Sequence, residues 1–351
     1  QSDVRPGDVF FWFTTCVWMM WNWLVSALAS QATVVLYDGS PTADGIETLW
    51  RLAERAGITH FGTSPKFLAA NADAGLSPGR AVDLGSVRWL LSTGAPLSPE
   101  QFDWVYAHVG ADVHLASISG GTDIIGCFAA GSPVLAVRRG ELQCRVLGMA
   151  VAAFNEEGQR VVSEKGELVC TRPFPSMPLG FWEDPDDERY HAAYFERFDG
   201  VWAHGDYVEL RPHGGMVFYG RSDTTLNPGG VRIGTAEIYR ALEGMSEVAD
   251  AVVVSRAHDG DEEIVLCVQP AAEIELDDAL VQRIKDRIRS AASPRHVPRH
   301  VVAVDAVPYT LSGKKVEKAV ARSIAGDAVA KRDALANPEA LAQYERLGLP
   351  E

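Results

Sequence analysis

Cysteine is scarce in this chain and is not arranged for metal binding. Its five cysteines are scattered over 351 residues without a Cys-x-x-Cys pair, so neither a zinc motif nor a disulfide framework is indicated. Basic residues are also few, because 32 lysines and arginines stand against 47 acidic residues and give a net charge of −15. This balance argues against nonspecific binding to nucleic acid or anionic membranes. We expect a cytoplasmic protein with no nucleic-acid partner.

Charged residues are missing from residues 9–37, and the run Phe10 to Ala29 is long enough to span a membrane. Two features favour a buried helix instead. Polar residues interrupt the run, and the β-forming segment Val34 to Tyr37 follows at once, as in a helix that leads into a parallel strand. The run is not typical of a signal peptide, because it lacks a basic segment before it and a small-residue cleavage site after it. We therefore expect no membrane insertion.

The hydrophobic pattern predicts three regions and a tail. In residues 1–125, strands and helices alternate, which indicates a parallel α/β sheet with helices on its faces. In residues 126–220, short strands separated by Gly, Pro and Asn turns indicate an antiparallel barrel or sandwich. Residues 221–325 predict a small α+β domain, and residues 326–351 a peripheral helical tail. A chain of this length, 47% hydrophobic, can fill several such cores.

Individual elements follow from the same pattern. The predicted helices are residues 18–30, 44–56, 65–74, 98–109, 235–243 and 276–291. The predicted strands are residues 33–37, 59–62, 87–91, 112–116, 141–146, 150–154, 166–171, 201–204, 207–211, 216–219, 248–255, 264–269 and 301–304.

The segment Pro308-Tyr309-Thr310-Leu311-Ser312-Gly313-Lys314-Lys315 predicts a tight turn near the C-terminus. Proline cannot continue a helix or a central strand, and Ser-Gly permits a reversal that directs the Lys314 ammonium outward. A lysine at such a tip can reach an anion. A solvated surface turn explains the octapeptide equally well.

Two short motifs place a carboxylate after a predicted strand. Asp123 ends Ser119-Gly120-Gly121-Thr122-Asp123, at the edge where ligand crevices open in parallel sheets. Asp206 ends His204-Gly205-Asp206, where it could accept both hydroxyls of a nucleotide ribose in bonds of roughly 1.5–3 kcal/mol each. A turn with an aspartate cap also explains each motif taken alone.

Taken together, these segments resemble the core motifs of the acyl-adenylate-forming enzymes, which include acyl-CoA synthetases, adenylation domains and luciferases. Segments similar to five family motifs occur in the family's order. They are Ser92-Thr93-Gly94-Ala95-Pro96, Ser119 to Asp123, His204 to Asp206 with Gly220-Arg221-Ser222-Asp223, Asn227 to Ile238, and Pro308 to Lys315.

The resemblance implies roles in nucleotide chemistry. Lys314 would bridge the substrate carboxylate and the α-phosphate of ATP. Thr122 would lie near the phosphates, and Asp123 would hold Mg²⁺ although the family has the longer glutamate there. The remaining nucleotide contacts would come from Gly94, Ala95, Pro96, Asp206, Arg221 and Arg232.

The resemblance also implies a mobile C-terminal domain. Asp223 would be the hinge about which that domain turns between the two steps of the reaction. Gly230 would let the pantetheine arm of coenzyme A pass close to the backbone. ATP, Mg²⁺ and coenzyme A are thus the expected cofactors and substrates.

Within this superfamily, the aromatic segment from Phe10 to Asn22 is most similar to the acetoacetyl-CoA synthetases, relatives of the acetyl-CoA synthetases. In the latter, a tryptophan closes the acyl pocket at the position of Gly120. Loss of that indole would admit an acid larger than acetate. Trp18, Met19, Met20 and Thr93 would line the rest, although core packing also explains the Trp-Met cluster.

The implied activity is ATP-dependent conversion of acetoacetate to acetoacetyl-CoA, with release of AMP and pyrophosphate. Two alternatives stay open: another short-chain carboxylate:CoA ligase, and a silent fragment that only binds nucleotide or coenzyme A. The family's phosphate loop has no counterpart before Gln1, and the chain does not begin with methionine. We therefore expect the C-terminal portion of a longer enzyme, with little adenylation activity when isolated. The pattern indicates no particular oligomeric state.

Overall fold

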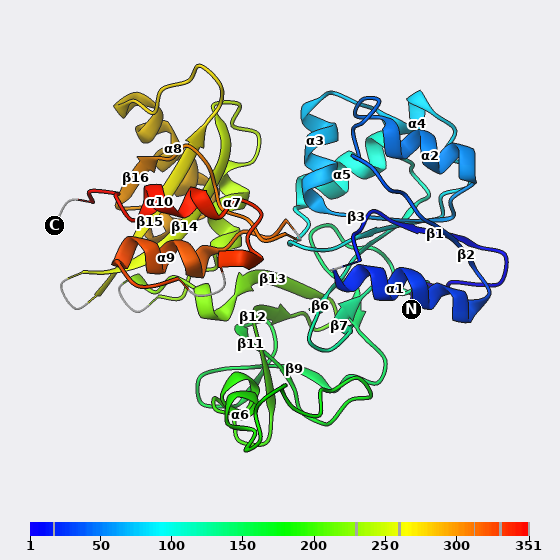
Figure 1. Cartoon of the computed structure of the whole chain (residues 1–351), viewed down its shortest axis with the longest axis horizontal. Coiled ribbons are helices and arrows are strands. Elements are labelled where there is room, and N and C mark those ends of the chain that lie inside the picture. The colour runs from blue at the N-terminus through cyan, green and yellow to red at the C-terminus, as the bar shows by residue number, and fades with distance from the viewer. Residues whose placement is uncertain (17, 229–230, 259–260, 312, 330–331, 350–351) are drawn as a thin grey trace. The chain divides into compact units, whose positions relative to one another are not determined.

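The computed structural model describes residues 1–16, 18–228, 231–258, 261–311, 313–329 and 332–349 (Figure 1). The chain divides into two compact units. Unit 1 comprises Gln1–His204 and Val208–Phe218, and unit 2 comprises Gly205–Tyr207 and Tyr219–Glu351. The four-part domain division expected from the sequence stays a prediction.

A five-stranded parallel sheet forms the first part of unit 1, as predicted. Its strand order is β2-β1-β3-β4-β5. The strands are β1 (Val9–Trp12), β2 (Thr33–Val35), β3 (His60–Thr63), β4 (Trp89–Ser92) and β5 (His114–Ser117). The pattern predicted no strand at β1, because a strand buried on both faces shows no alternation of apolar and polar residues. Its residues Phe10, Phe11 and Trp12 are all buried.

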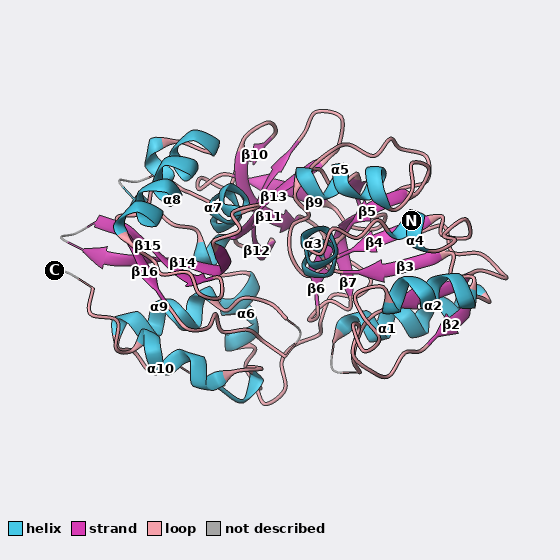
Figure 2. Cartoon of the chain, turned by 90° about the horizontal axis from the view of Figure 1, so that it is seen from above, coloured by secondary structure: helices cyan, strands magenta, loops and turns pink. Residues whose placement is uncertain are grey.

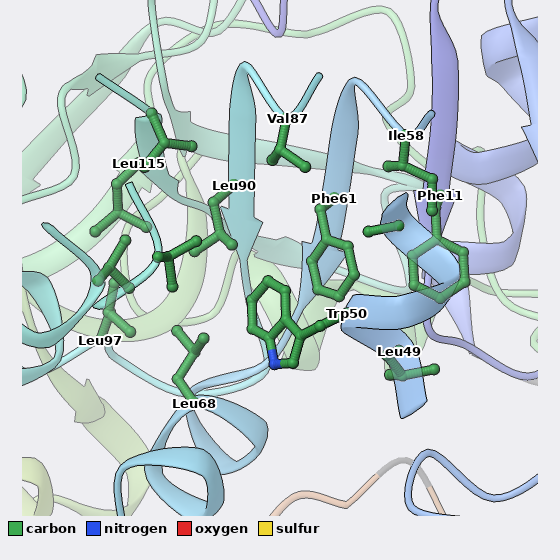
Figure 3. Close-up of a cluster of buried hydrophobic side chains, with 14 of the residues drawn as sticks. Phe11, Leu49, Trp50, Ile58, Phe61, Leu68, Val87, Leu90, Leu97 and Leu115 are labelled. Atoms are coloured by element: carbon green, nitrogen blue, oxygen red, sulfur yellow. The ribbon is translucent and has the colours of Figure 1, made fainter. Parts of the chain in front are cut away.

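Helices accompany this sheet in alternation with its strands. They are α1 (Met19–Ser26), the 3-10 turn η1 (Ala27–Ser30), α2 (Thr48–Ala56), α3 (Pro65–Asp73), α4 (Pro78–Ala81) and α5 (Pro99–His108). Trp50 of α2 stacks on Phe61 of β3 at 4.6 Å between ring centroids (Figure 3), and its indole N–H donates to buried Asn71. Within the described residues, no helix is both long enough and apolar enough to cross a membrane. The uncharged run instead forms β1, α1 and η1.

Two further sheets follow in the chain. A three-stranded antiparallel sheet contains β6 (Ser119–Gly121), β7 (Gly126–Ala130) and β8 (Cys144–Arg145). A five-stranded sheet has the order β10-β9-β11-β12-β13, and β9 pairs antiparallel with β10 and β11. Its strands are β9 (Val151–Phe154), β10 (Arg160–Val161), β11 (Lys165–Cys170), β12 (Trp202–Leu210) and β13 (Met216–Arg221). The two strands predicted between residues 201 and 211 are one strand, β12, and helix α6 (Glu188–Tyr194) precedes it.

Unit 2 contains a three-stranded sheet between two layers of helix, as Figure 2 shows. Strand β15 (Asp261–Pro270) pairs antiparallel with β14 (Val248–His258) and parallel with β16 (His300–Ala303). Helices α7 (Thr235–Leu242) and α8 (Asp278–Ala291) lie on one side of this sheet. Helices α9 (Glu317–Ala325) and α10 (Leu341–Tyr344) lie on the other. The shorter 3-10 turns are η2 (Ser222–Thr224), η4 (Pro294–His296), η5 (Arg332–Ala334) and η6 (Pro338–Ala340).

The tail after residue 326 is not peripheral, which corrects the sequence-based expectation. Leu341 and Tyr344 are almost completely buried and share a core cluster with Val252, Val254 and Cys267. Short helical turns bring these side chains onto the face of the β14–β15 hairpin that α7 and α8 leave uncovered. The tail thus completes the core of unit 2.

Candidate active site

The predicted site residues of unit 1 follow the carboxyl ends of neighbouring parallel strands. Thr93 to Pro96 follow β4, and Ser119 to Asp123 follow β5 after a single residue. The two loops are tied together, because the Thr93 hydroxyl donates to the carbonyl oxygen of Ile118 at 2.7 Å. This edge of a parallel sheet is where ligands bind in open α/β folds.

Three of the residues predicted to line the acyl pocket, Trp18, Met19 and Met20, share one cluster, and Thr93 and Gly120 are not part of it. Met20 is buried there, and Trp18 and Met19 pack against it together with Cys127 of β7. The Trp18 indole lies 3.9 Å from where a Cβ atom on Gly94 would be, so it borders the loop after β4. Burial raises the pKa of the Cys127 thiol to about 12.

Gly120 is enclosed by backbone. A methyl group at this position would overlap the carbonyl oxygen of Gly126 and the Cα atom of Cys127 in the neighbouring strand. The β6–β7 register is also irregular between Ser119 and Gly120. The structure therefore supplies a reason for glycine that is separate from pocket volume, namely the close approach of two strands. The pocket-opening role of Gly120 stays a prediction.

Asp123 is held by a hydrogen bond from Tyr194 and lies against a glycine. The Tyr194 hydroxyl donates to Oδ2 at 2.6 Å, and Oδ1 lies directly over Gly121, where a Cβ atom would overlap it. Asp123 and the neighbouring Thr122 are exposed. Ile125, in the same turn, has a φ of 43°, which is rare for a β-branched residue.

Tyr194 belongs to a group that the sequence interpretation missed. Its ring stacks on Trp202 at 3.7 Å and 13°. The Trp202 indole N–H donates to Nδ1 of His204 at 3.3 Å, which assigns the proton of a neutral His204 to Nε2. The signal was the spacing of Tyr190 and Tyr194, four residues apart, as on one helix face.

In unit 2, the structure brings the predicted ribose contacts together. Arg221 lies 3.3 Å from Asp206 and 3.5 Å from Asp223, measured between nitrogen and oxygen. Asp223 also pairs with Lys318 of α9 at 3.1 Å. Gly205 has a φ of 82°, and a Cβ atom there would overlap the Arg221 guanidinium, so both geometry and space require glycine.

Arg232 lies beside this group. Its guanidinium carbon is 5.9 Å from the centroid of the Tyr207 ring, within cation–π range. Next to Arg232, Ile233 forms an isolated antiparallel bridge with Leu226. Helix α7 begins two residues after Ile233. Gly230, the predicted coenzyme A contact, lies outside the described residues.

The predicted turn at Lys314 is confirmed. The backbone N–H of Gly313 donates to the Thr310 carbonyl, and that of Thr310 donates to the Lys314 carbonyl, both at 2.8 Å. Gly313 has a φ of 78°, and the side chain of Lys314 is exposed. Ser312 lies outside the described residues. The chemical role of Lys314 stays a prediction.

Comparison with known proteins identifies the family. The model of the AMP-binding enzyme family matches residues 1–182, and the model of the AMP-binding enzyme C-terminal domain matches residues 237–314. The chain belongs to the AMP-binding enzyme family. This agrees with the resemblance found in the sequence motifs.

Among members of this family, the chain is similar to acetoacetyl-CoA synthetases. It is 55% identical over 341 residues to acetoacetyl-coenzyme A synthetase of Rhizobium meliloti (strain 1021), covering 97% of the chain and 52% of that protein. It is 48% identical to acetoacetyl-CoA synthetase of Xenopus tropicalis, covering 99% and 52%. The chain therefore spans about half the length of the relatives it matches.

Solved structures of related proteins are also similar to this chain. Acetoacetyl-CoA synthetase from Streptomyces lividans superposes with a TM-score of 0.92 at 44% identity, over 98% of the chain and 53% of that structure. The anthranilate CoA ligase AuaEII, at 21% identity, superposes with a TM-score of 0.74 over 89% of the chain and 58% of that structure, and shows the shared fold alone. The mixed architecture predicted from the sequence, with parallel and antiparallel sheets, is thus confirmed as that of this family.

Proposed function

We propose that the protein containing this chain is an AMP-forming ligase that converts acetoacetate to acetoacetyl-CoA. The observation that carries the proposal is the similarity to acetoacetyl-CoA synthetases over nearly the whole chain, at 55% identity for one bacterial relative. The local geometry of the predicted residues within each unit supports it.

Nucleotide binding would use the Asp206–Arg221 pair. A carboxylate fixed by a guanidinium at 3.3 Å is preorganised to accept two ribose hydroxyls, because its orientation does not have to be selected on binding. Arg232 would face phosphate, where the planar guanidinium matches the oxygens of the anion. Gly94, Ala95 and Pro96 would contact the adenine.

Asp123 is suited to Mg²⁺ as a single carboxylate ligand. Tyr194 fixes its Oδ2 oxygen, and the carboxylate is exposed next to Thr122. No cluster of three or more His, Cys, Asp or Glu side chains that could enclose a metal is found among the described residues. Mg²⁺ usually binds through one or two carboxylates, water and substrate phosphates, so the single carboxylate of Asp123 is enough for the proposed site. When bound, Mg²⁺ would neutralise charge on the phosphates.

The reaction would proceed in two steps. In the first, a carboxylate oxygen of acetoacetate attacks the α-phosphorus of ATP, and the bond to the β-phosphate oxygen breaks to release pyrophosphate. Lys314 would stabilise the developing negative charge, a contribution of roughly 10²- to 10³-fold by analogy with single oxyanion donors. In the second step, the coenzyme A thiolate attacks the acyl carbon and AMP leaves, while the thiol proton passes to solvent.

The acid would lie against the cluster of Trp18, Met19 and Met20, with Thr93 at its border. These side chains offer an apolar surface for a short carbon chain. A different short-chain acid would keep every nucleotide contact and differ only here.

The test is pyrophosphate release by the complete gene product that carries this chain, supplied with ATP, Mg²⁺ and coenzyme A. Acetoacetate is compared with acetate, propionate and 3-hydroxybutyrate. We expect a clear preference for acetoacetate. Preference for another acid would overturn the substrate, and the absence of release with every acid would favour a silent, nucleotide-binding protein.

The role of Lys314 is tested in the same assay with Lys314→Ala. We expect loss of pyrophosphate release with an unchanged melting temperature, because the side chain is exposed. Lys285→Ala is the control, since Lys285 is also a lysine of unit 2, but it is half-buried and its ammonium donates to the carbonyl oxygen of Arg299. Normal release by Lys314→Ala would overturn the assignment.

A further inference from the structure

Asp250 of β14 is bound by both residues that close the Lys314 turn. Tyr309 and Lys315 face each other across the turn as an isolated antiparallel pair. The Tyr309 hydroxyl donates to Oδ2 of Asp250 at 2.5 Å, and the Lys315 ammonium lies 2.7 Å from Oδ1. One carboxylate therefore holds the two legs of the turn, one on each oxygen.

Lys315 is fixed on further sides. Its ammonium also donates to the carbonyl oxygen of Ala251 and lies 4.3 Å from the centroid of the Tyr239 ring. Tyr239 is in turn anchored, because its hydroxyl donates to Glu317 at 3.1 Å and accepts the Val253 N–H at 3.2 Å. With these three partners, Lys315 is held in place and is not a mobile surface cation.

Burial keeps the phenols of this network protonated. It raises the pKa of Tyr239 and of Tyr309 well above 10, so both stay hydrogen-bond donors at any physiological pH. Burial also raises the pKa of the Glu317 carboxyl that accepts the Tyr239 hydroxyl.

Lys314 has the opposite environment although it is the next residue. Its side chain is exposed, and its backbone N–H donates to the Thr310 hydroxyl at 3.0 Å. Of the two neighbouring lysines, Lys315 is therefore the one bound to the sheet, and Lys314 is the one presented to solvent.

We propose that Asp250 is a positioning residue for Lys314: it clamps Tyr309 and Lys315, and so fixes the turn that presents the Lys314 ammonium. The inference rests on the proposed function, in which Lys314 acts at the α-phosphate. Lys315 is a structural anchor and not a second phosphate ligand. The clamp matters because a misplacement of about 1 Å can reduce a rate by about 100-fold.

The experiment separates the two half-reactions in the complete gene product. Adenylation is measured as acid-dependent exchange of pyrophosphate into ATP. Thioester formation is measured from coenzyme A and supplied butyryl-adenylate, an analogue with the carbon-chain length of acetoacetate. Lys314 is assigned to the first half-reaction alone, so a loss of clamping should affect that step alone.

For Asp250→Asn, we expect exchange to fall by about 10- to 100-fold while thioester formation stays within about twofold. Glu247→Gln is the matched control. It removes a carboxylate charge just before the same strand, from an ion pair with Arg283 that does not involve the turn. We expect this control to change neither half-reaction.

Tyr309→Phe is a second test variant in case Asp250→Asn does not fold, since it removes a single hydroxyl and keeps the ring. We expect it to reduce exchange by about fivefold. The inference would be overturned if a folded Asp250→Asn variant exchanged pyrophosphate at the normal rate. If Asp250→Asn fails to fold, a normal exchange rate in Tyr309→Phe would overturn it instead. So would an equal fall of both half-reactions.

Tryptic cleavage between Lys314 and Lys315 tests the clamp without catalysis. Proteases cut locally opened chain, so Asp250→Asn should be cut faster than the wild type and Glu247→Gln should not. Equal cleavage rates would contradict the clamp. If the wild-type protein showed no pyrophosphate exchange, the proposed function would be overturned. Faster cleavage of Asp250→Asn would in that case still support the clamp. The effect of the clamp on catalysis would be overturned together with the proposed function.

Discussion

The Tyr194 hydroxyl donates a 2.6 Å hydrogen bond to Asp123, a residue 71 positions earlier in the chain. Helix α6 thereby sets the orientation of the carboxylate proposed to bind Mg²⁺. Because Tyr194 also stacks on Trp202, its position depends on the aromatic core of unit 1 rather than on the exposed turn. Asp123 is thus positioned more firmly than its exposure suggests.

Replacing Tyr194 with phenylalanine should weaken Mg²⁺·ATP binding. The ring can keep its stack on Trp202, but Asp123 loses one hydrogen bond worth about 1 kcal/mol. We expect the dissociation constant of Mg²⁺·ATP, measured by calorimetry, to rise several-fold at an unchanged melting temperature. Tyr190→Phe is the control, because that hydroxyl donates to the Pro178 carbonyl instead. Equal affinities in the two variants would contradict this role of Tyr194.

Gly120→Ala should destabilise unit 1. The added methyl would overlap backbone atoms of β7, and overpacking of this kind costs about 1–3 kcal/mol. Urea denaturation measures the change in the free energy of unfolding. Gly126→Ala is the comparison, since a Cβ atom there meets its nearest neighbours at an ordinary 3.4 Å. A Gly120→Ala protein as stable as the wild type would contradict the steric reason for glycine at this position.

Ile125→Asn should stabilise the turn beside Asp123. A β-branched residue at a φ of 43° carries about 1–2 kcal/mol of strain, whereas asparagine tolerates this conformation. The isoleucine side chain is 55% exposed, so little buried surface is lost. We expect a rise in melting temperature of a few degrees. Val162→Asn, at a similarly exposed β-branched residue without positive φ, should give no rise.

His60 should make stability depend on pH. Burial lowers its pKa below the ordinary 6.5. The unfolded chain therefore binds a proton more readily than the folded one. The contribution of His60 to stability is fully present above about pH 6.5 and is lost as the pH falls from there toward the lowered pKa. His60→Gln should flatten this slope in urea denaturation between about pH 5 and 8.

Sequence patterns predicted those features of the structure that depend on residues close together in the chain. The Lys314 turn follows from the conformational freedom of Gly313, and the alternating pattern predicted the parallel sheet. The spacing of the family motifs placed Asp206 and Arg221 at one nucleotide site, where the structure pairs them. Strand β1 was missed because burial on both faces removes periodicity.

The supporting contacts lay beyond such reasoning. Asp250 meets Tyr309 across 59 positions, and Asp123 meets Tyr194 across 71. No residue close to Asp250 or Asp123 in the sequence indicates which tyrosine binds that aspartate. Contacts of this kind are set by how sheets and helices pack, which no short window of sequence encodes.

The burial of Tyr344 affects how this protein can be divided or fused. The family model of the C-terminal domain ends at residue 314, yet Leu335, Leu341 and Tyr344 fill the core beside Val252 and Val254. A protein cut at the family boundary would carry an open apolar face, a recognised cause of aggregation. Tags, fusion partners and engineered stop codons in this region belong after Tyr344.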